Sequence, residues 1–312
     1  MSGPDATLTV LRPGACTLVV DRGRPHCRSL GVPVGGAADR AALAVGNALV
    51  GNPDDAAALE VALLGPVLRA DRPLACVLFG APFELHTDQR NLAAGKTFTL
   101  RPGEELHVGG TATGMRAYLC VRGGLHTPVI LRSRSSLAPL TAGAELPCRS
   151  GEIAERSLGF SVGAGPISLP RKPPLLAVIP GPQADWFPPD ALGGRSFAVA
   201  NDSNRMGLRL AGEPLPWPGR EMVSEPVCPG SVQATPDGRC IILGVDGQTI
   251  GGYPKISQVV GAHLDALGQY RPGDRIGLRI VELEEAEKLS QTRRERLRRW
   301  TARIRAASLS PS

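Results

Sequence analysis

Two arginines four residues apart are the first feature of this sequence that could do chemistry. The string SNRMGLRLAG, residues 203–212, places Arg205 and Arg209 around Met206 and Gly207. If the segment is helical, both guanidinium groups share a face, and if it is a loop they can still converge. Two planar cations are suited to clamping a carboxylate or a carboxyphosphate-like group. The pair is therefore a candidate anion-binding site.

A second candidate site lies in the glycine-rich string DGQTIGGYPKI, residues 246–256. The pair of glycines, Gly251 and Gly252, lets the backbone approach a ligand closely. Gln248, Tyr253 and Lys255 supply an amide, a phenol and an ammonium group beside it. The set predicts a site for a small polar ligand. The alternative is a glycine-rich turn with solvated side chains.

A third glycine-rich loop, GVPVGGAADR at residues 31–40, presents Asp39 at the point where a helix is expected to begin. The start of a helix favours anions and carboxylates. An Asp in that position most often only caps the helix, so Asp39 has the weakest catalytic claim of the three loops.

Signatures of well-known catalytic and metal sites are weak. The string GFSVG at residues 159–163 matches the nucleophile elbow and nominates Ser161, but the sequence GAGP follows it where a helix is required. Neither a P-loop nor a G-x-G-x-x-G loop between a strand and a helix occurs. His86, His107 and His126 lack the spacing of metal ligands, so no metal site is predicted.

The elements that must position these residues are mostly short strands. Apolar runs ending in Gly or Pro turns recur, first in residues 8–148 and again after residue 174, as barrels and sandwiches require. One helix is expected after Asp39, ending near Gly51. A polar passage rich in Gly, Ser and Pro at residues 149–174 marks a boundary, which predicts domains at residues 1–160 and 161–283.

The last segment, residues 284–312, is predicted to form a basic C-terminal helix and tail. From Glu282 onward the chain begins acidic and ends basic, which matches the polarity of a helix dipole. Leu297, Trp300 and Ile304 follow helical spacing and are expected to pack on the body of the protein. The alternative is that the seven arginines of residues 293–305 bind RNA or another anionic surface.

Composition limits the class of protein. The chain has 312 residues, 42% of them hydrophobic, with 38 Gly and 29 Pro, which favours a folded, turn-rich protein over a disordered one. Seven cysteines without a C-x-x-C pair are expected to be reduced and mostly buried. No apolar run or leader peptide suits a membrane, so a soluble, cytoplasmic protein is expected. Half of the net charge of +6 comes from residues 282–312, so the composition of the remaining body makes no general case for nucleic acid.

Several strings together resemble a known family. The loop GVPVGGAADR is followed by LVGNPDDAAALEVALLGP, RAYLCVRGG, SNRMGLRLAG and QTIGGYPKISQVVGAHLDALGQYRPGD. Their order and spacing are similar to those of the biotin-dependent carboxyltransferase family. That family includes the 5-oxoprolinase C subunit, the KipI antagonist KipA and the carboxyltransferase domain of urea carboxylase. The resemblance runs from about residue 8 to residue 283.

The resemblance implies a mainly β fold with two cyclophilin-like β-barrel domains and few helices. It also implies the C subunit of an ATP-dependent 5-oxoprolinase, which opens 5-oxoproline to glutamate with a KipI-like B subunit plus a LamB/YcsF-like A subunit. ATP would then act in the complex. One alternative is a carboxyltransferase that uses biotin from another chain, and another is a non-catalytic partner of a KipI-like protein. The substrate would be a small amide or carboxylate.

The resemblance and the residue chemistry together nominate site residues. Arg205 and Arg209 would hold a carboxylate or amide, while Lys255 and Gln248 would polarise a carbonyl or phosphorylated amide oxygen. Tyr253 would shape the wall of the site. Lys255, Gln248 and Arg205 are thus the predicted catalytic set. The predicted substrate-binding set is Arg209, Tyr253, Gly251, Gly252, Asp39, Asp21 and Arg24.

Departures from the family pattern fall in the first half of the chain. Val20 stands where relatives usually carry Gln, and Gly35 and Ala38 replace a Ser and a Met. Arg132 replaces the Gly of a G-S-R-S-T string. A hydroxyl and an amide that could touch substrate are therefore missing, which leaves the exact substrate open.

Overall fold

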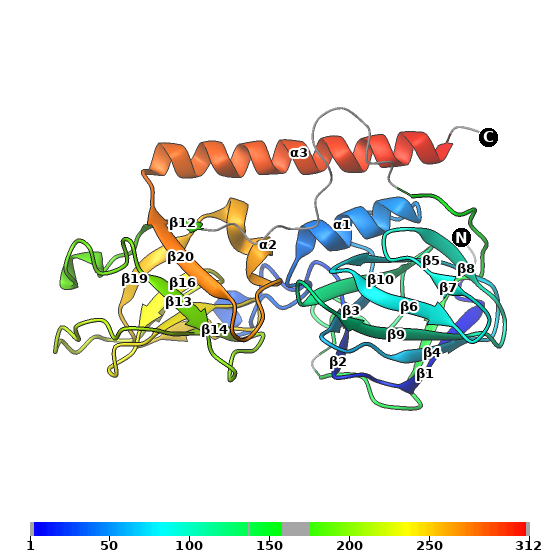
Figure 1. Cartoon of the computed structure of the whole chain (residues 1–312), viewed down its shortest axis with the longest axis horizontal. Coiled ribbons are helices and arrows are strands. Elements are labelled where there is room, and N and C mark those ends of the chain that lie inside the picture. The colour runs from blue at the N-terminus through cyan, green and yellow to red at the C-terminus, as the bar shows by residue number, and fades with distance from the viewer. Residues whose placement is uncertain (1–2, 137, 158–174, 310–312) are drawn as a thin grey trace. The chain divides into compact units, whose positions relative to one another are not determined.

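The computed structural model describes residues 3–136, 138–157 and 175–309, with the side chains of 308 and 309 left out. The chain folds into two compact units (Figure 1). Unit 1 comprises residues 1–23, 39–171 and 297–312, and unit 2 comprises residues 24–38 and 172–296. The short segment 24–38 is thus grouped with the second half of the chain. The predicted boundaries at 160 and 283 stay a prediction, and Ser161 lies outside the described residues.

Unit 1 is built from two antiparallel sheets. One has the strand order β11-β1-β4-β9-β6-β7 and the other β2-β3-β10-β5-β8. The strands are β1 (Ala6–Arg12), β2 (Cys16–Val20), β3 (Ala58–Ala62), β4 (Val67–Ala70), β5 (Leu74–Gly80), β6 (Phe83–Thr87), β7 (Asn91–Leu92), β8 (Thr97–Leu100), β9 (Glu105–Thr111), β10 (Arg116–Val121) and β11 (Glu145–Cys148).

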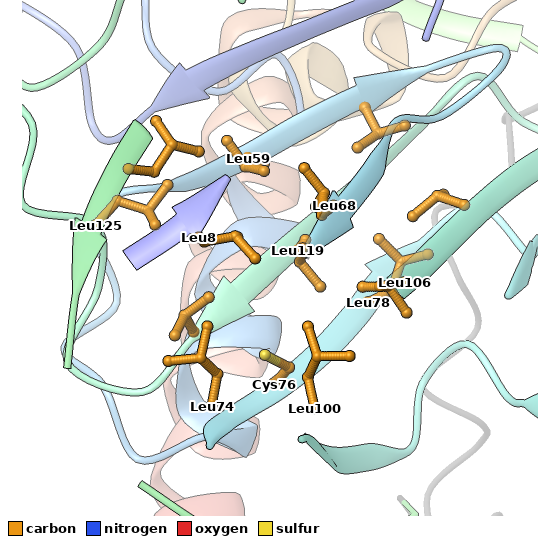
Figure 2. Packing of buried hydrophobic residues seen from close by; sticks show 14 of the residues in the cluster. Leu8, Leu59, Leu68, Leu74, Cys76, Leu78, Leu100, Leu106, Leu119 and Leu125 are labelled. Carbon is orange, nitrogen blue, oxygen red and sulfur yellow. The ribbon is translucent and has the colours of Figure 1, made fainter. Parts of the chain in front are cut away.

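Alternating apolar residues from both sheets of unit 1 form one core. Leu8 and Leu68 come from the first sheet, and Leu59, Leu78 and Leu119 come from the second; all five are fully buried (Figure 2). Burying such a side chain stabilises the fold by about 1.5–3 kcal/mol. The predicted helix is present as α1 (Arg40–Leu49), which packs on β5 and β10.

Unit 2 is organised around a closed seven-stranded barrel with the order β12-β19-β16-β17-β14-β13-β20. The mainly β fold class is therefore confirmed, whereas the cyclophilin-like architecture stays a prediction for both units. The elements are η1 (Arg28–Leu30), β12 (Leu175–Pro180), η2 (Ala184–Trp186), β13 (Ser196–Val199), β14 (Gly207–Ala211), β15 (Glu225–Pro226), β16 (Ser231–Ala234), β17 (Cys240–Leu243), β18 (Ile250–Gly251), β19 (Lys255–Val259), η3 (Gly261–His263), α2 (Leu264–Leu267) and β20 (Arg275–Ile280).

The predicted C-terminal helix is confirmed as α3 (Leu283–Leu309), drawn in red in Figure 1. Ile304 is 7% exposed, and Leu297 and Trp300 are partly buried, so the apolar stripe packs as expected. Arg293 pairs with Asp265 at 3.2 Å within unit 2. No helix in the described ranges is long and apolar enough to cross a bilayer.

The cysteines are free thiols, as predicted, and four of the seven are buried. Burial raises the pKa of the Cys120 thiol far above its ordinary value, so Cys120 stays protonated and unreactive. Cys228 is the exposed one of the set.

One histidine of unit 2, His263, is partly buried and hydrogen-bonded to the main chain. His263 Nδ1 accepts a hydrogen bond of 2.8 Å from the backbone N–H of Ala177. Burial, together with the nearby cations of Arg279 and Arg293, lowers the pKa of His263. Below the ordinary histidine pKa of about 6.5 the unfolded chain therefore binds a proton that the folded chain resists.

Unit 2 is accordingly expected to lose stability as the pH falls from about 6.5 through the lowered pKa of His263. Measuring the free energy of unfolding between pH 8 and pH 5 checks this. His263→Asn keeps an acceptor for Ala177 but cannot titrate, so its curve should be flatter. An equal acid-induced loss in both proteins would contradict this role of His263.

Candidate functional site

Arg205 forms the centre of a polar corner in unit 2. It lies in the turn before β14, where its Nε is 2.6 Å and its Nη2 is 3.0 Å from the two carboxylate oxygens of Asp246. Nη2 also donates to the carbonyl of Gly36 at 2.7 Å. The two-point ion pair fixes the guanidinium and leaves its charge balanced by Asp246.

This corner holds the loop of residues 31–38 against the barrel. The N–H of Gly35 donates to the carbonyl of Val245 at 2.8 Å, and the N–H of Arg24 donates to the carbonyl of Val34 at 2.6 Å. A Cβ atom on Gly35 would lie 3.7 Å from Arg24 Nη1 and 3.8 Å from Asp246 Oδ1. Gly35, which departs from the family pattern, therefore faces a guanidinium and a carboxylate.

Arg209 has a different environment from Arg205. The segment is a turn followed by strand β14, so the helical version of the predicted clamp is wrong. Arg209 Nε lies 3.3 Å from the carboxylate of Asp202, in an exposed ion pair. Each arginine has its own carboxylate partner, and a shared ligand stays a prediction.

Lys255, at the start of β19, is tied to a carboxylate that sequence reasoning missed. Its Nζ lies 2.7 Å from Glu225 Oε2 and donates to the carbonyl of Pro226 at 3.1 Å. The Lys255 side chain is 12% exposed. The ion pair with Lys255 and a hydrogen bond from Gln183 lower the pKa of Glu225 below its ordinary value. Lys255 is thus a nearly buried cation with a fixed counter-ion.

Gln248 lies just before β18, and Tyr253 lies in the short loop between β18 and β19. Gln248 is exposed, and Tyr253 is 40% exposed. The buried side chain of Gln233 donates to the carbonyl of Tyr253 at 3.2 Å. A β-bulge occurs where β16 and β19 pair Gln233 with Lys255, and bulges often redirect side chains at functional sites. The structure therefore brings Gln233, Tyr253 and Lys255 together.

Gly251, in β18, lies against the amide end of the buried Gln233 side chain. A Cβ atom on Gly251 would lie 2.7 Å from Gln233 Nε2, whereas one on Gly252 would meet its nearest atom, Ser224 Oγ, at 3.3 Å. Gly251→Ala should therefore lower the free energy of unfolding of unit 2 by about 1–3 kcal/mol, through overpacking, and Gly252→Ala by less. Denaturant titration of both variants measures this. An equal effect of the two substitutions would contradict the packing argument.

Asp21, a predicted substrate ligand in unit 1, forms its hydrogen bonds within the protein. Its carboxylate accepts hydrogen bonds from the hydroxyls of Ser133 and Ser135 and from the backbone N–H groups of Gly23 and Arg134, all at 2.6–2.8 Å. Burial raises the pKa of Asp21, but these bonds outweigh burial and lower it. The geometry gives Asp21 a structural role.

The turn that presents Ser133 to Asp21 contains an unusual backbone. Ile130 and Ser133 exchange both backbone hydrogen bonds, and the residues between them, Leu131 and Arg132, have φ values of 51° and 64°. Left-handed φ is unfavourable for residues other than Gly, Asn and Asp. The family glycine that Arg132 replaces therefore stands where glycine fits best.

Asp39 caps α1, as its position predicts. Its carboxylate accepts from the N–H of Ala42 at 2.9 Å, and its own N–H donates to the hydroxyl of Tyr118 at 2.7 Å. Tyr118 in turn donates to Glu60 at 2.8 Å, and Glu60 pairs with Arg116 at 3.2 Å. Asp39, Glu60, Tyr118 and Arg116 are each at most 5% exposed. The carboxylate of Asp39 is therefore buried in a structural network and is not an exposed catalytic group.

The described residues contain no group of three or more His, Cys, Asp or Glu placed to hold a metal ion. His86 and His107, isolated in the sequence, stack across β6 and β9 with ring centroids 4.9 Å apart.

Residues 30–280 match the family model described as carboxyltransferase domain, subdomain A and B. The chain belongs to this carboxyltransferase domain family. The ion pair of Arg205 with Asp246 and the ion pair of Lys255 with Glu225 both lie within the matched region. Of the departures in this carboxyltransferase-family chain, Val20 is 1% exposed, so an amide there would need buried partners.

Named relatives of this carboxyltransferase-family chain fall into two groups. It is 34% identical to the 5-oxoprolinase C subunit of Haemophilus influenzae over 281 residues, covering 87% of this chain and 90% of the relative. It is 32% identical to the protein of that name from Escherichia coli, covering 91% and 94%. The crystal structure of the Kluyveromyces lactis urea carboxylase matches with a TM-score of 0.84 at 25% identity, covering 96% of this chain and 29% of that one.

Proposed function

We propose that this chain is the C subunit of a 5-oxoprolinase complex that opens the lactam of 5-oxoproline to give glutamate. The observation that carries the proposal is the match to two proteins of that name over at least 87% of this chain and 90% of each relative. The proposed partners in a cytoplasmic heteromer are a KipI-like chain, the B subunit, together with a LamB/YcsF-like chain, the A subunit.

Unit 2 supplies the proposed substrate site. The ammonium group of Lys255 has three N–H bonds, and the described residues take two of them, with Glu225 and the carbonyl of Pro226 as partners. The third N–H is directed to the lactam oxygen in this proposal, where it stabilises charge that grows as the ring opens. Tyr253, two residues before Lys255, and Gln248 are exposed side chains of the same glycine-rich string.

ATP does not fit the described residues of the candidate site. Arg205 is balanced by Asp246 and Lys255 by Glu225, so this site carries little net positive charge for a triphosphate. The sequence also lacks a phosphate-binding P-loop. ATP is therefore assigned to the partner chains, and no step on this chain is derived through it.

The second candidate function is carboxyl transfer from biotin carried by another chain. The structural match to urea carboxylase favours it, although this chain spans only 29% of that enzyme. The two functions are separated by offering the assembled complex 5-oxoproline with ATP, or urea with carboxybiotin, in parallel. Glutamate from the first mixture alone supports the oxoprolinase. Carboxylated urea from the second mixture alone would replace it with the carboxyltransferase.

A further inference from the structure

Gln183, a residue outside every glycine-rich loop of the candidate site, contacts Lys255 in two ways. Its Oε1 accepts a hydrogen bond of 3.0 Å from the backbone N–H of Lys255. Its Nε2 lies 3.3 Å from Oε2 and 3.5 Å from Oε1 of Glu225, the carboxylate that pairs with Lys255 Nζ. One amide therefore holds both the main chain of Lys255 and its counter-ion.

The environment of Gln183 makes this arrangement rigid. Gln183 is 6% exposed and precedes the short helix η2, and its own N–H donates to the carbonyl of Lys255 at 3.3 Å. A Cβ atom on Gly181, two residues earlier, would collide with the carbonyl oxygen of Lys255. The two backbones are thus in direct contact, and Gln183 has little room to take another conformation.

We propose that Gln183 is a positioning residue, which fixes Lys255 and Glu225 so that the third N–H of the Lys255 ammonium is held toward a ligand oxygen. The catalytic part of this inference rests on the proposed function. The structural part, that Gln183 immobilises the Lys255 side chain through Glu225, does not. The ligand group that suits such a donor is a carbonyl or carboxylate oxygen.

The chemistry of the amide explains why glutamine is needed at this position. Its carbonyl oxygen faces an N–H, and its NH₂ group faces a carboxylate, so both ends are matched. Methionine has a similar length but can make neither hydrogen bond. Glutamate keeps the acceptor for the Lys255 N–H, but it places a second negative charge against Glu225.

The first test measures how fast the Lys255 amine is acetylated by acetic anhydride, by peptide mass spectrometry of the folded full-length chain. In Gln183→Met, Lys255 should react roughly 3- to 10-fold faster, the equivalent of losing one or two hydrogen bonds. Lys288, an exposed lysine on α3, is the internal reference in each sample. Gln291→Met removes a 2.9 Å hydrogen bond between Gln and Glu on α3 and is the matched control.

The second test measures glutamate release by the reconstituted complex. Gln183→Met should lower kcat roughly 3- to 10-fold with little change in KM.

A second variant grades the acetylation result. In Gln183→Glu, the acetylation rate of Lys255 should rise less than in Gln183→Met, because glutamate keeps one of the two hydrogen bonds. If Gln183→Met does not fold, Gln183→Leu, which also makes neither hydrogen bond and adds no charge, carries both measurements.

The outcomes separate this inference from the proposed function. If Lys255 is acetylated faster in Gln183→Met but the wild-type complex releases no glutamate, Gln183 positions Lys255 and the oxoprolinase assignment is wrong. Unchanged acetylation of Lys255 in both variants overturns the positioning role, whatever the activity. If Gln183→Met lowers kcat no more than Gln291→Met does, Gln183 does not contribute to the reaction.

Discussion

Replacing Lys255 by alanine is expected to lower the turnover of the reconstituted 5-oxoprolinase complex about 100-fold. The substitution removes the lysine of the candidate site and leaves Glu225 without its 2.7 Å partner. A nearby negative charge then replaces the donor that the developing oxyanion requires. The rate of ATP-dependent glutamate release at saturating 5-oxoproline measures the effect.

Two further variants define what the loss means. Lys288→Ala removes an exposed lysine on α3 and should leave turnover unchanged. Lys255→Ala with Glu225→Gln removes the leftover charge, and any partial recovery measures the part of the loss that Glu225 causes. Wild-type turnover in Lys255→Ala would remove this lysine from the reaction.

Replacing Arg116 by methionine is expected to reduce the free energy of unfolding of unit 1 by about 3–5 kcal/mol. Arg116 is 5% exposed, and its Nε lies 3.2 Å from the carboxylate of Glu60, which is 2% exposed. Without Arg116, the buried negative charge of Glu60 loses this positive partner. Calorimetric unfolding of the intact chain measures the effect as a lower transition temperature.

The same network supplies comparisons for this prediction. Tyr118→Phe removes the hydroxyl between Asp39 and Glu60 and should cost about 1–3 kcal/mol, because the charge of Arg116 remains. Arg69→Met, on the exposed face of β4, should change stability by no more than about 0.5 kcal/mol. If Arg116→Met is as mild as Arg69→Met, the buried ion pair does not stabilise unit 1.

Local features of this fold could be predicted from the sequence because short-range physics decides them. The carboxylate of Asp39 caps the helix three residues away, and α3 lies in the stretch free of Gly and Pro where it was expected. Some strands likewise end at a Gly or Pro turn, as β1 does before Pro13 and Gly14.

The contacts of the candidate site could not be predicted because they join distant parts of the chain. Glu225 and Gln183 reach Lys255 from 30 and 72 residues away, and no local pattern marks either residue. Asp246 begins a string that was singled out, yet its partner Arg205 lies 41 residues earlier. The two arginines of that earlier string needed counter-ions, and this requirement was the signal that could have directed attention to Asp246.

Glutamate release from 5-oxoproline and ATP, by this chain mixed with its KipI-like and LamB/YcsF-like partners, tests the proposed function most directly. Each chain is omitted in turn, and the Lys255→Ala variant replaces the wild-type chain in one further mixture. We predict that release requires all three chains and falls about 100-fold with the variant. Full release in the mixture that lacks this chain would contradict its assignment to the enzyme complex.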